Sequence, residues 1–236
     1  VLSANSTLTN VTLMSVYPNY LSGNINGTLT SDNVYIVIAD VNIANEDTLI
    51  IEPGTIIKFE SECSMNVFGL LQAIGSGENK ILFTSNQSYP NWNDWNDINF
   101  FETANNNSIL KHCIIENGGS VYIYGANISV ENCELRYLQN TITCANYSIV
   151  QIKNNYFHDF FECGVNVDGG SNIIIKNNVF EINASYSTII YTGICCSGTG
   201  IIENNLIINV SQNSNYNEGM FLNGSDTQIS NNIVHN

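Results

Sequence analysis

Basic residues are scarce in this chain of 236 residues. Five lysines and the single Arg136 stand against 21 acidic residues, and the formal net charge is −15. Binding to a phosphate backbone needs a basic patch, so a nucleic-acid partner is excluded, and anionic lipids and polyuronic acids are disfavoured. The longest apolar run, near Val34–Ala39, is far shorter than the roughly 18 residues of a membrane span. No membrane span is therefore expected.

Charge of either sign is also sparse. Charged residues make up 11% of the chain while the hydrophobic share of 44% is ordinary, so a disordered chain is excluded. The polarity comes from amides, because 40 residues are Asn and 32 are Ile. Asn tolerates the left-handed backbone of tight turns and Ile favours strands, which together predict many short strands joined by tight turns.

A short motif, Ile-x-Asn-Asn followed by an apolar residue, recurs in the second half of the chain. It begins at Ile152, Ile175, Ile202 and Ile229, with weaker versions at Val130 and Leu110. Side chains alternate with a period of 2 around it, and no helical stripe runs for three turns. A repeat of slightly more than 20 residues built from strands predicts a solenoid. The predicted corner column is His112, Asn132, Asn155, Asn178, Asn205 and Asn232.

A coil of about 23 residues fits the perimeter of a three-sided parallel β-helix whose coils stack about 4.8 Å apart. The corner Asn residues are expected to take left-handed backbone and to form an amide ladder. Two inward rows are predicted: Ile98, Val121, Ile142, Val165, Ile194, Met220 and Phe100, Ile123, Cys144, Val167, Cys196, Leu222. Two outward columns follow from the period of 2: Asn99, Tyr122, Thr143, Asn166, Cys195, Phe221 and Phe101, Tyr124, Ala145, Asp168, Ser197, Asn223.

Several segments resemble the opening coils of secreted right-handed parallel β-helix proteins of the pectate-lyase-like superfamily. They are Thr48–Phe59 with its Glu-Pro-Gly corner, Phe68–Gly75, Ile81–Ser85 and the Trp95-x-x-Ile98-x-Phe100 pattern, and the Ile-x-Asn-Asn coils are similar to that superfamily's generic repeats. The resemblance implies an all-β, single-domain right-handed β-helix. It implies no single function, because the superfamily includes lyases, hydrolases, epimerases, adhesins, phage spikes and surface-layer proteins.

The predicted organisation has two parts. Residues 1–30 form an N-terminal strand or cap segment, and residues 31–236 form the β-helix, irregular to about 95 and regular from 96 to 236. About nine to eleven coils are expected. The longer spacings late in the chain place additional loops at Asn183–Thr192 and Ser211–Glu218.

Catalytic residues are sparse on the predicted outward face. Hydrolysis of a glycosidic bond needs two carboxyl groups roughly 5 to 10 Å apart, and the outward columns supply only Asp168. His158, Asp159 and Glu162 form the densest titratable cluster and could act as a base and its orienting group, or simply lie in a solvated turn. The expectation is a protein that is not an enzyme.

Binding and metal candidates are few. The outward aromatic residues Phe101, Tyr122, Tyr124 and Phe221 fit a covering loop, a subunit contact or a glycan. Asp94 and Asp97 could hold Ca²⁺ or be ordinary surface acids. No other cofactor is expected.

Seven cysteines divide by position. Cys113 and Cys133 follow the corner column and point inward on adjacent coils, where they could bond or remain stacked thiols. Three cysteines are placed outside the core, and an odd cysteine in a secreted protein suggests a bond between chains or a free thiol. The candidates for links between chains are Cys63, Cys163 and Cys195; the alternative is a fully reduced protein.

An extracellular, cell-surface location is predicted from the resemblance and from ten Asn-x-Ser/Thr sequons. These glycosylation candidates are Asn5, Asn10, Asn26, Asn86, Asn106, Asn127, Asn146, Asn183, Asn209 and Asn223. The sequence begins with Val1, which fits a removed leader, and it stops after an Asn corner without a capping segment, so its last coil is expected to meet another copy.

The predicted function is a non-catalytic structural protein that self-associates into a surface layer, sheath or fibre. The alternative is a carbohydrate-binding or polysaccharide-cleaving β-helix, and an adhesin is a third class. The predicted partners are therefore copies of the same chain, with glycans as the alternative ligand.

Overall fold

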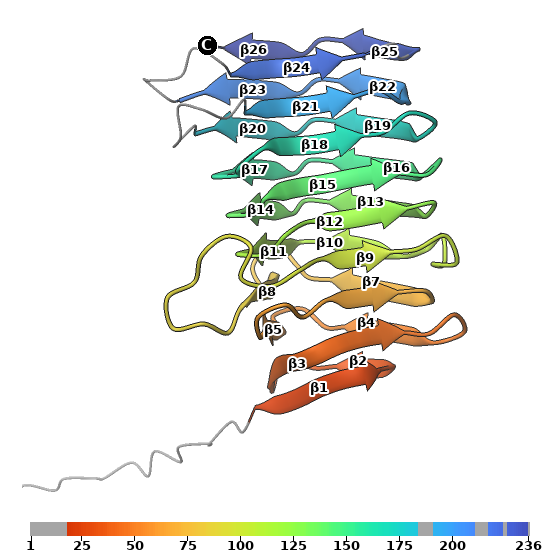
Figure 1. The fold of residues 1–236 in the computed structure, drawn as a ribbon, viewed down its shortest axis with the longest axis vertical. Helices are drawn as coiled ribbons and strands as arrows, with labels where there is room; N and C mark the ends of the chain where they lie inside the picture. Colours follow the sequence, from red (N-terminus) through yellow and green to blue (C-terminus); the bar gives the residue numbers. More distant parts are fainter. Residues whose placement is uncertain (1–17, 184–190, 211–216, 224–225, 236) are drawn as a thin grey trace, which may run out of the picture.

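A computed structural model describes residues 18–183, 191–210, 217–223 and 226–235. Within these ranges the chain forms 26 strands and no helix, and the strands pair in parallel throughout. Figure 1 shows them stacked along one axis, from β1 (Asn19–Asn24) in red to β26 (Ile233–His235) in blue. The predicted all-β parallel β-helix is confirmed.

The register divides the strands into three stacked faces. The first face contains the second half of β3 (Val34–Ile43), then β6 (Met65–Val67), β9 (Ile98–Phe100), β12 (Val121–Tyr124), β15 (Asn140–Ala145), β18 (Cys163–Val167), β21 (Thr192–Cys196) and β24 (Glu218–Leu222). β1 pairs with both halves of β3 and begins the stack.

The second face is one sheet of nine strands: β2 (Gly27–Leu29), β4 (Thr48–Ile51), β7 (Leu70–Ile74), β10 (Ile109–Lys111), β13 (Asn127–Glu131), β16 (Ile149–Lys153), β19 (Asn172–Lys176), β22 (Thr199–Glu203) and β25 (Thr227–Ser230). Nine levels lie at the lower end of the predicted nine to eleven coils. β2 belongs to this sheet, so the end of the predicted N-terminal segment is already part of the stack.

The third face begins with the first half of β3 and continues with β5 (Ile56–Phe59), β8 (Ile81–Ser85), β11 (Cys113–Glu116), β14 (Glu134–Arg136), β17 (Tyr156–His158), β20 (Val179–Ile182), β23 (Leu206–Asn209) and β26. The two predicted additional loops lie between β20 and β21 and between β23 and β24. Both therefore join the third face to the first, and parts of them (184–190 and 211–216) lie outside the described residues.

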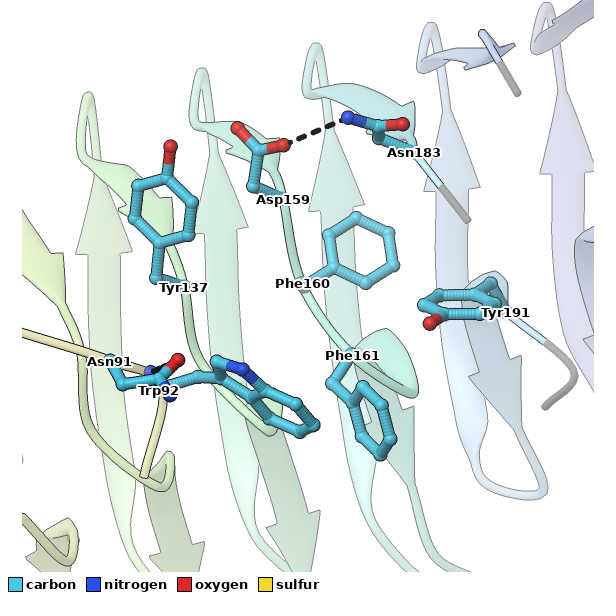
Figure 2. A pocket seen from close by; sticks show the side chains of 8 residues that line it. All are labelled: Asn91, Trp92, Tyr137, Asp159, Phe160, Phe161, Asn183 and Tyr191. Carbon is cyan, nitrogen blue, oxygen red and sulfur yellow. Dashed lines mark hydrogen bonds between the residues drawn. The ribbon is translucent and has the colours of Figure 1, made fainter. Parts of the chain in front are cut away.

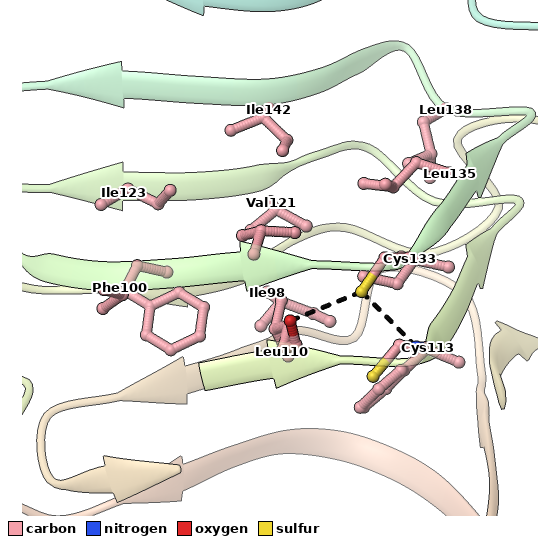
Figure 3. Packing of buried hydrophobic residues seen from close by; sticks show 14 of the residues in the cluster. Ile98, Phe100, Leu110, Cys113, Val121, Ile123, Cys133, Leu135, Leu138 and Ile142 are labelled. Atoms are coloured by element: carbon pink, nitrogen blue, oxygen red, sulfur yellow. Dashed lines mark hydrogen bonds between the residues drawn. The ribbon is translucent and has the colours of Figure 1, made fainter. Parts of the chain in front are cut away.

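The two predicted inward rows are confirmed in register. Val121 pairs with Ile98 and Ile142, and Cys144 pairs with Ile123 and Val167. Figure 3 shows part of these rows packed against Leu110, Cys113 and Cys133 from the other faces. The rows are buried from β9 to β21, whereas Leu222 in β24 is 38% exposed. In the outward columns, Ala145 departs from the prediction because it is only 5% exposed.

The predicted Asn corner column needs a correction of one residue. The left-handed residues are His112, Asn132, Asn154, Asn177, Asn204 and Asn231, with φ between 50° and 59°. The amide ladder is formed by the next position, Cys133 followed by Asn155, Asn178, Asn205 and Asn232. The predicted column combined the two positions, and His112 has a backbone role there instead of a place in the ladder.

The two Asn residues of each pair therefore do different work. The first accepts positive φ, which lets the chain turn sharply from the second face to the third. The second is buried, and its amide bonds to the coils on either side: Asn178 Nδ2 donates to Ile152 O at 2.9 Å and to Asn205 Oδ1 at 3.0 Å. This ladder satisfies backbone groups that a sharp buried corner would otherwise leave unpaired.

Candidate functional site

A groove runs along the first face. Its first hollow, of about 410 Å³, is lined by Phe68, Phe101, Glu102, Thr103, Tyr122 and Tyr124. A second hollow of about 350 Å³ shares Tyr122 with the first and is lined mainly by amides and hydroxyls. A third of about 470 Å³ shares Asn140 and Asn166 with the second and ends at Phe221. We call this continuous surface the first-face groove.

Aromatic side chains form one end of the groove and Phe221 lies at the other. Phe68 and Phe101 stack in parallel with ring centroids 4.7 Å apart, and Tyr122 and Tyr124 lie 6.2 Å apart. Burial and then the charge of Asp168 raise the pKa of Tyr122, so its hydroxyl stays protonated at neutral pH. Tyr124 is 38% exposed and Phe221 is 49% exposed. The structure thus places all four predicted aromatic residues in the lining of the groove, and adds Phe68.

Amide groups continue the outward column of Asn99 toward the N-terminal coils. Asn99 Nδ2 donates to Asn66 Oδ1 at 3.0 Å, and Asn66 Nδ2 donates to Asn42 Oδ1 at 3.1 Å. Sequence reasoning missed this outer ladder. The signal was present, because Val41–Ile43, Met65–Val67 and Ile98–Phe100 each place one Asn between two buried apolar residues.

The carboxylates of the groove are held by neutral donors. Asp97 Oδ1 accepts from Ser120 Oγ at 2.8 Å, and Glu162 Oε2 accepts from Asn140 Nδ2 at 3.1 Å. Glu102 and Glu218, which sequence reasoning did not single out, also line it. Among the described residues that line the three hollows, none is Lys or Arg. Asp168 is exposed at the end of the first face and lies outside these linings.

The predicted cluster of His158, Asp159 and Glu162 is divided by the corner. His158 Nδ1 lies 2.8 Å from Asp159 Oδ2 on the third-face side, whereas Glu162 bonds to Asn140 in the groove. His158 Nε2 also lies 3.5 Å from Glu134 Oε1. His158 therefore belongs to a charged cluster on the third face.

Glu134 is the centre of that third-face cluster. Lys80 Nζ contacts it at 3.0 Å and Arg136 Nη1 at 2.6 Å, while Arg136 Nη2 also reaches Glu116 at 2.7 Å. Burial acts to raise the pKa of Glu134, but Lys80, Arg136 and His158 outweigh it and hold the pKa below the usual carboxyl range. Three of the six basic residues of the chain thus include two that neutralise one glutamate, which indicates a structural role.

A further hollow of about 240 Å³ lies where the loop before β9 meets the corners after β14 and β17. Figure 2 shows its lining, with Trp92 and Phe161 adjacent and Asp159 bonded to Asn183. The ring centroids of Trp92 and Phe161 are 4.0 Å apart. This contact joins the loop that follows β8 to the corner that precedes β18.

The proposed calcium ligands of that loop are engaged separately. Asp94 Oδ2 accepts the Asn91 N–H at 2.8 Å, and Asp97 bonds to Ser120. In the part of the chain that the structure describes, no group of three or more His, Cys, Asp or Glu side chains could hold a metal ion.

All seven cysteines lie in the described residues and none forms a disulfide. The placement of Cys63 and Cys163 outside the core is wrong, because they are only 5% and 6% exposed. Cys63 enters the core because its turn folds inward beneath the loop before β9. Cys195 is half-buried and faces the groove as predicted. Cys113 and Cys133 are stacked thiols, and the Cys113 N–H donates to Cys133 Sγ at 3.4 Å.

The sequons at Asn5 and Asn10 lie outside the described residues. The other eight asparagines are all at least partly accessible, so each side chain could carry a glycan without entering the core. The fully exposed ones are Asn26, Asn106, Asn183 and Asn223, and the half-buried ones are Asn86, Asn127, Asn146 and Asn209.

Three parallel faces, inward apolar rows and a stacked Asn corner are typical of β-helices. The family described as the right-handed β-helix region matches residues 100–236, which is more than half of the chain. The chain belongs to the right-handed β-helix family. This family membership agrees with the predicted fold and handedness.

One curated relative gives a local match. Protein bark beetle of Drosophila melanogaster is 34% identical over 82 residues, which cover 31% of this β-helix chain and 3% of that protein. The chain thus corresponds to a very small part of that relative's length. No solved structure matches the chain. Within the described residues, no helix is long and apolar enough to span a membrane.

Proposed function

We propose that this β-helix is a non-catalytic, extracellular recognition protein that binds a neutral polysaccharide along the first-face groove. The observation that carries the proposal is the continuity of the groove, from the aromatic group of Phe68, Phe101, Tyr122 and Tyr124 through amides to Phe221. From β9 to β24 it crosses six stacked strands, or about 24 Å at the usual strand spacing. That length suits a polymer better than a single sugar.

The chemistry of the lining supports a sugar chain. Aromatic rings offer flat apolar faces for the C–H faces of sugar rings, with the Tyr122 and Tyr124 hydroxyls as a polar edge. Between the aromatic ends, side chains such as Asn96, Gln139 and Asn166 offer both donors and acceptors to hydroxyl groups. Carboxylates without a Lys or Arg neighbour in the lining would repel a uronate polymer, so the ligand is neutral.

The same lining supports binding without cleavage. A glycosidase needs one protonated and one ionised carboxyl group facing the same bond. Asp97 and Glu162 instead accept hydrogen bonds from Ser120 and Asn140, which stabilise the ionised form of both. Elimination from a uronate needs a base and cationic groups that hold the carboxylate, and the groove lining supplies no cation.

Tyr122→Ala is expected to weaken binding to a neutral polysaccharide about tenfold, because a stacked aromatic contact contributes about 0.5–1.5 kcal/mol. The measurement is affinity electrophoresis on neutral glucans, mannans and xylans beside pectin and alginate. Tyr89→Ala is the matched control, since Tyr89 is 93% exposed in the loop before β9 and outside the groove.

The same incubations should release neither reducing nor unsaturated ends, with or without Ca²⁺. Binding that Tyr122→Ala leaves unchanged would remove the groove from the proposal. Cleavage that is lost in Asp168→Asn would show instead that the protein is an enzyme.

Self-association is the second candidate, and exposed apolar residues of the last described strands favour it. Phe221, Ile233 and Val234 are 49%, 62% and 45% exposed. A second copy stacked on them would cover this surface. Light scattering of the concentrated chain should then give a multiple of 26.0 kDa, and Ile233→Ser should lower it. A monomer at every concentration, before and after reduction, would contradict both this candidate and the predicted disulfide links between chains.

A further inference from the structure

Two cysteines meet on the groove side of neighbouring strands. Asn166 of β18 pairs with Cys195 of β21, and Cys163 pairs with Thr192. Strict alternation would turn Cys163 toward the core, because Val165 is fully buried two residues later. Gly164 breaks this alternation: a Cβ there would lie 2.7 Å from the ring of Phe180 in the core. Gly164 and Val165 both face inward, so Cys163 lies on the groove side.

β21 repeats the same pattern one level along. A Cβ on Gly193 would lie 3.1 Å from the Ile207 side chain, and Ile194 is fully buried. Thr192 and Cys195 therefore share the groove side. Cys163 and Cys195 both line the third hollow, and their side chains form a hydrogen bond.

Cys195 is the accessible member of this pair. The other six cysteines of the chain are buried, and all seven are described. The hydrogen bond from Cys163 lowers the pKa of Cys195. Burial raises the pKa of Cys63, Cys113 and Cys144, and the contact with Cys195 together with burial raises that of Cys163. Since the thiolate is the reactive form, Cys195 is the nucleophile that solvent can reach.

We propose that Cys195 and Cys163 form a dithiol site that is oxidised by low-molecular-weight disulfides. The Cys195 thiolate attacks one sulfur of the disulfide, forms a mixed disulfide and releases the first thiolate. Cys163 then loses its proton, attacks Cys195 Sγ and releases the second. The protein dithiol is oxidised to an intrachain disulfide while the small disulfide is reduced to two thiols. This reaction does not depend on glycan binding.

The position of the pair favours closure within one chain over a link between chains. Cys163 is 6% exposed and lies against Cys195, so it meets a mixed disulfide at Cys195 before a second protein molecule can. Gly164 and Gly193 give the backbone of both strands the freedom to bring the sulfurs from contact to bonding distance.

Charge selects among small disulfides. Glu162 and Glu218 line the hollow beside the two thiols, and its described lining contains no Lys or Arg. A cationic disulfide such as cystamine is therefore attracted, whereas anionic oxidised glutathione is repelled. The rate with cystamine should exceed that with oxidised glutathione about fivefold or more at low salt, and the difference should shrink at high salt.

The test treats the reduced, folded chain with cystamine at neutral pH and maps its peptides by mass spectrometry without reductant. The wild-type chain should give a Cys163–Cys195 link and two released cysteamines. Cys163→Ser should stop at a stable cysteamine adduct on Cys195, and Cys195→Ser should leave Cys163 unmodified. Cys196→Ala, at the adjacent inward position, is the control and should behave as the wild type, with circular dichroism verifying that each variant is folded.

Three results would overturn the site. The first is an unreactive Cys195 in the folded chain. The second is modification spread evenly over all cysteines. The third is a cysteamine adduct on the wild type that persists as it does in Cys163→Ser, which would mean that Cys163 does not resolve it.

Discussion

Val167→Asp is expected to lower the free energy of unfolding by several kcal/mol, on the order of 4 kcal/mol, because it places an unpaired charge in the core. Val167 is 1% exposed and pairs with Cys144 on one side and Cys196 on the other. A carboxylate there has only apolar and thiol neighbours in its row, and none of them can replace its lost hydration. Thermal or urea unfolding followed by circular dichroism measures the change.

Asp168→Asn provides the matched control one residue along the chain. Asp168 is exposed, so the loss of its charge should change stability by less than about 0.5 kcal/mol. Equal losses for the two variants would mean that the alternation of inward and outward residues at the end of β18 is wrong.

Asn178→Ala should lower the free energy of unfolding by about 3 kcal/mol, since it leaves two buried backbone groups without their partners. Asn178 Oδ1 accepts the Asn155 N–H at 2.9 Å, and Asn178 Nδ2 donates to Ile152 O at 2.9 Å. Asn178 is 1% exposed, so water cannot replace either bond. The same unfolding experiment measures the loss.

Asn177→Gly is the control for this ladder, because the two residues are adjacent and of the same type. Asn177 has a φ of 59°, a conformation that glycine adopts without strain, and its side-chain bond to Asn154 is exposed. Its replacement should cost only a few tenths of a kcal/mol. A larger loss at Asn177 than at Asn178 would contradict the division of work within each Asn pair.

The site is a mixture of what spacing could and could not predict. The outward positions of Tyr122, Tyr124 and Phe221 follow from the period of 2, which holds along single strands. Phe68 was missed because its role depends on stacking against Phe101 from another level of the stack. Cys163 was misplaced because two consecutive inward residues, Gly164 and Val165, interrupt the alternation.

The sequence by itself determined the architecture. Parallel coils repeat the same environment at each level, so residues of one kind recur at nearly constant spacing and reveal both the repeat and the inward rows. The pairs Ile98–Val121 and Val165–Ile194 agree with that spacing even where loops of different length intervene. Local alternation supplied the rest, because a strand buries every second side chain.

Only the tertiary structure decided which member of each Asn pair turns the chain and which bonds across coils. Both members are Asn in four coils, so spacing cannot separate them, while backbone φ and burial do. The first-face groove and the Cys163–Cys195 contact were likewise beyond the sequence. Each is formed by side chains on different levels, whose approach depends on the packing and twist of whole coils and on no local pattern.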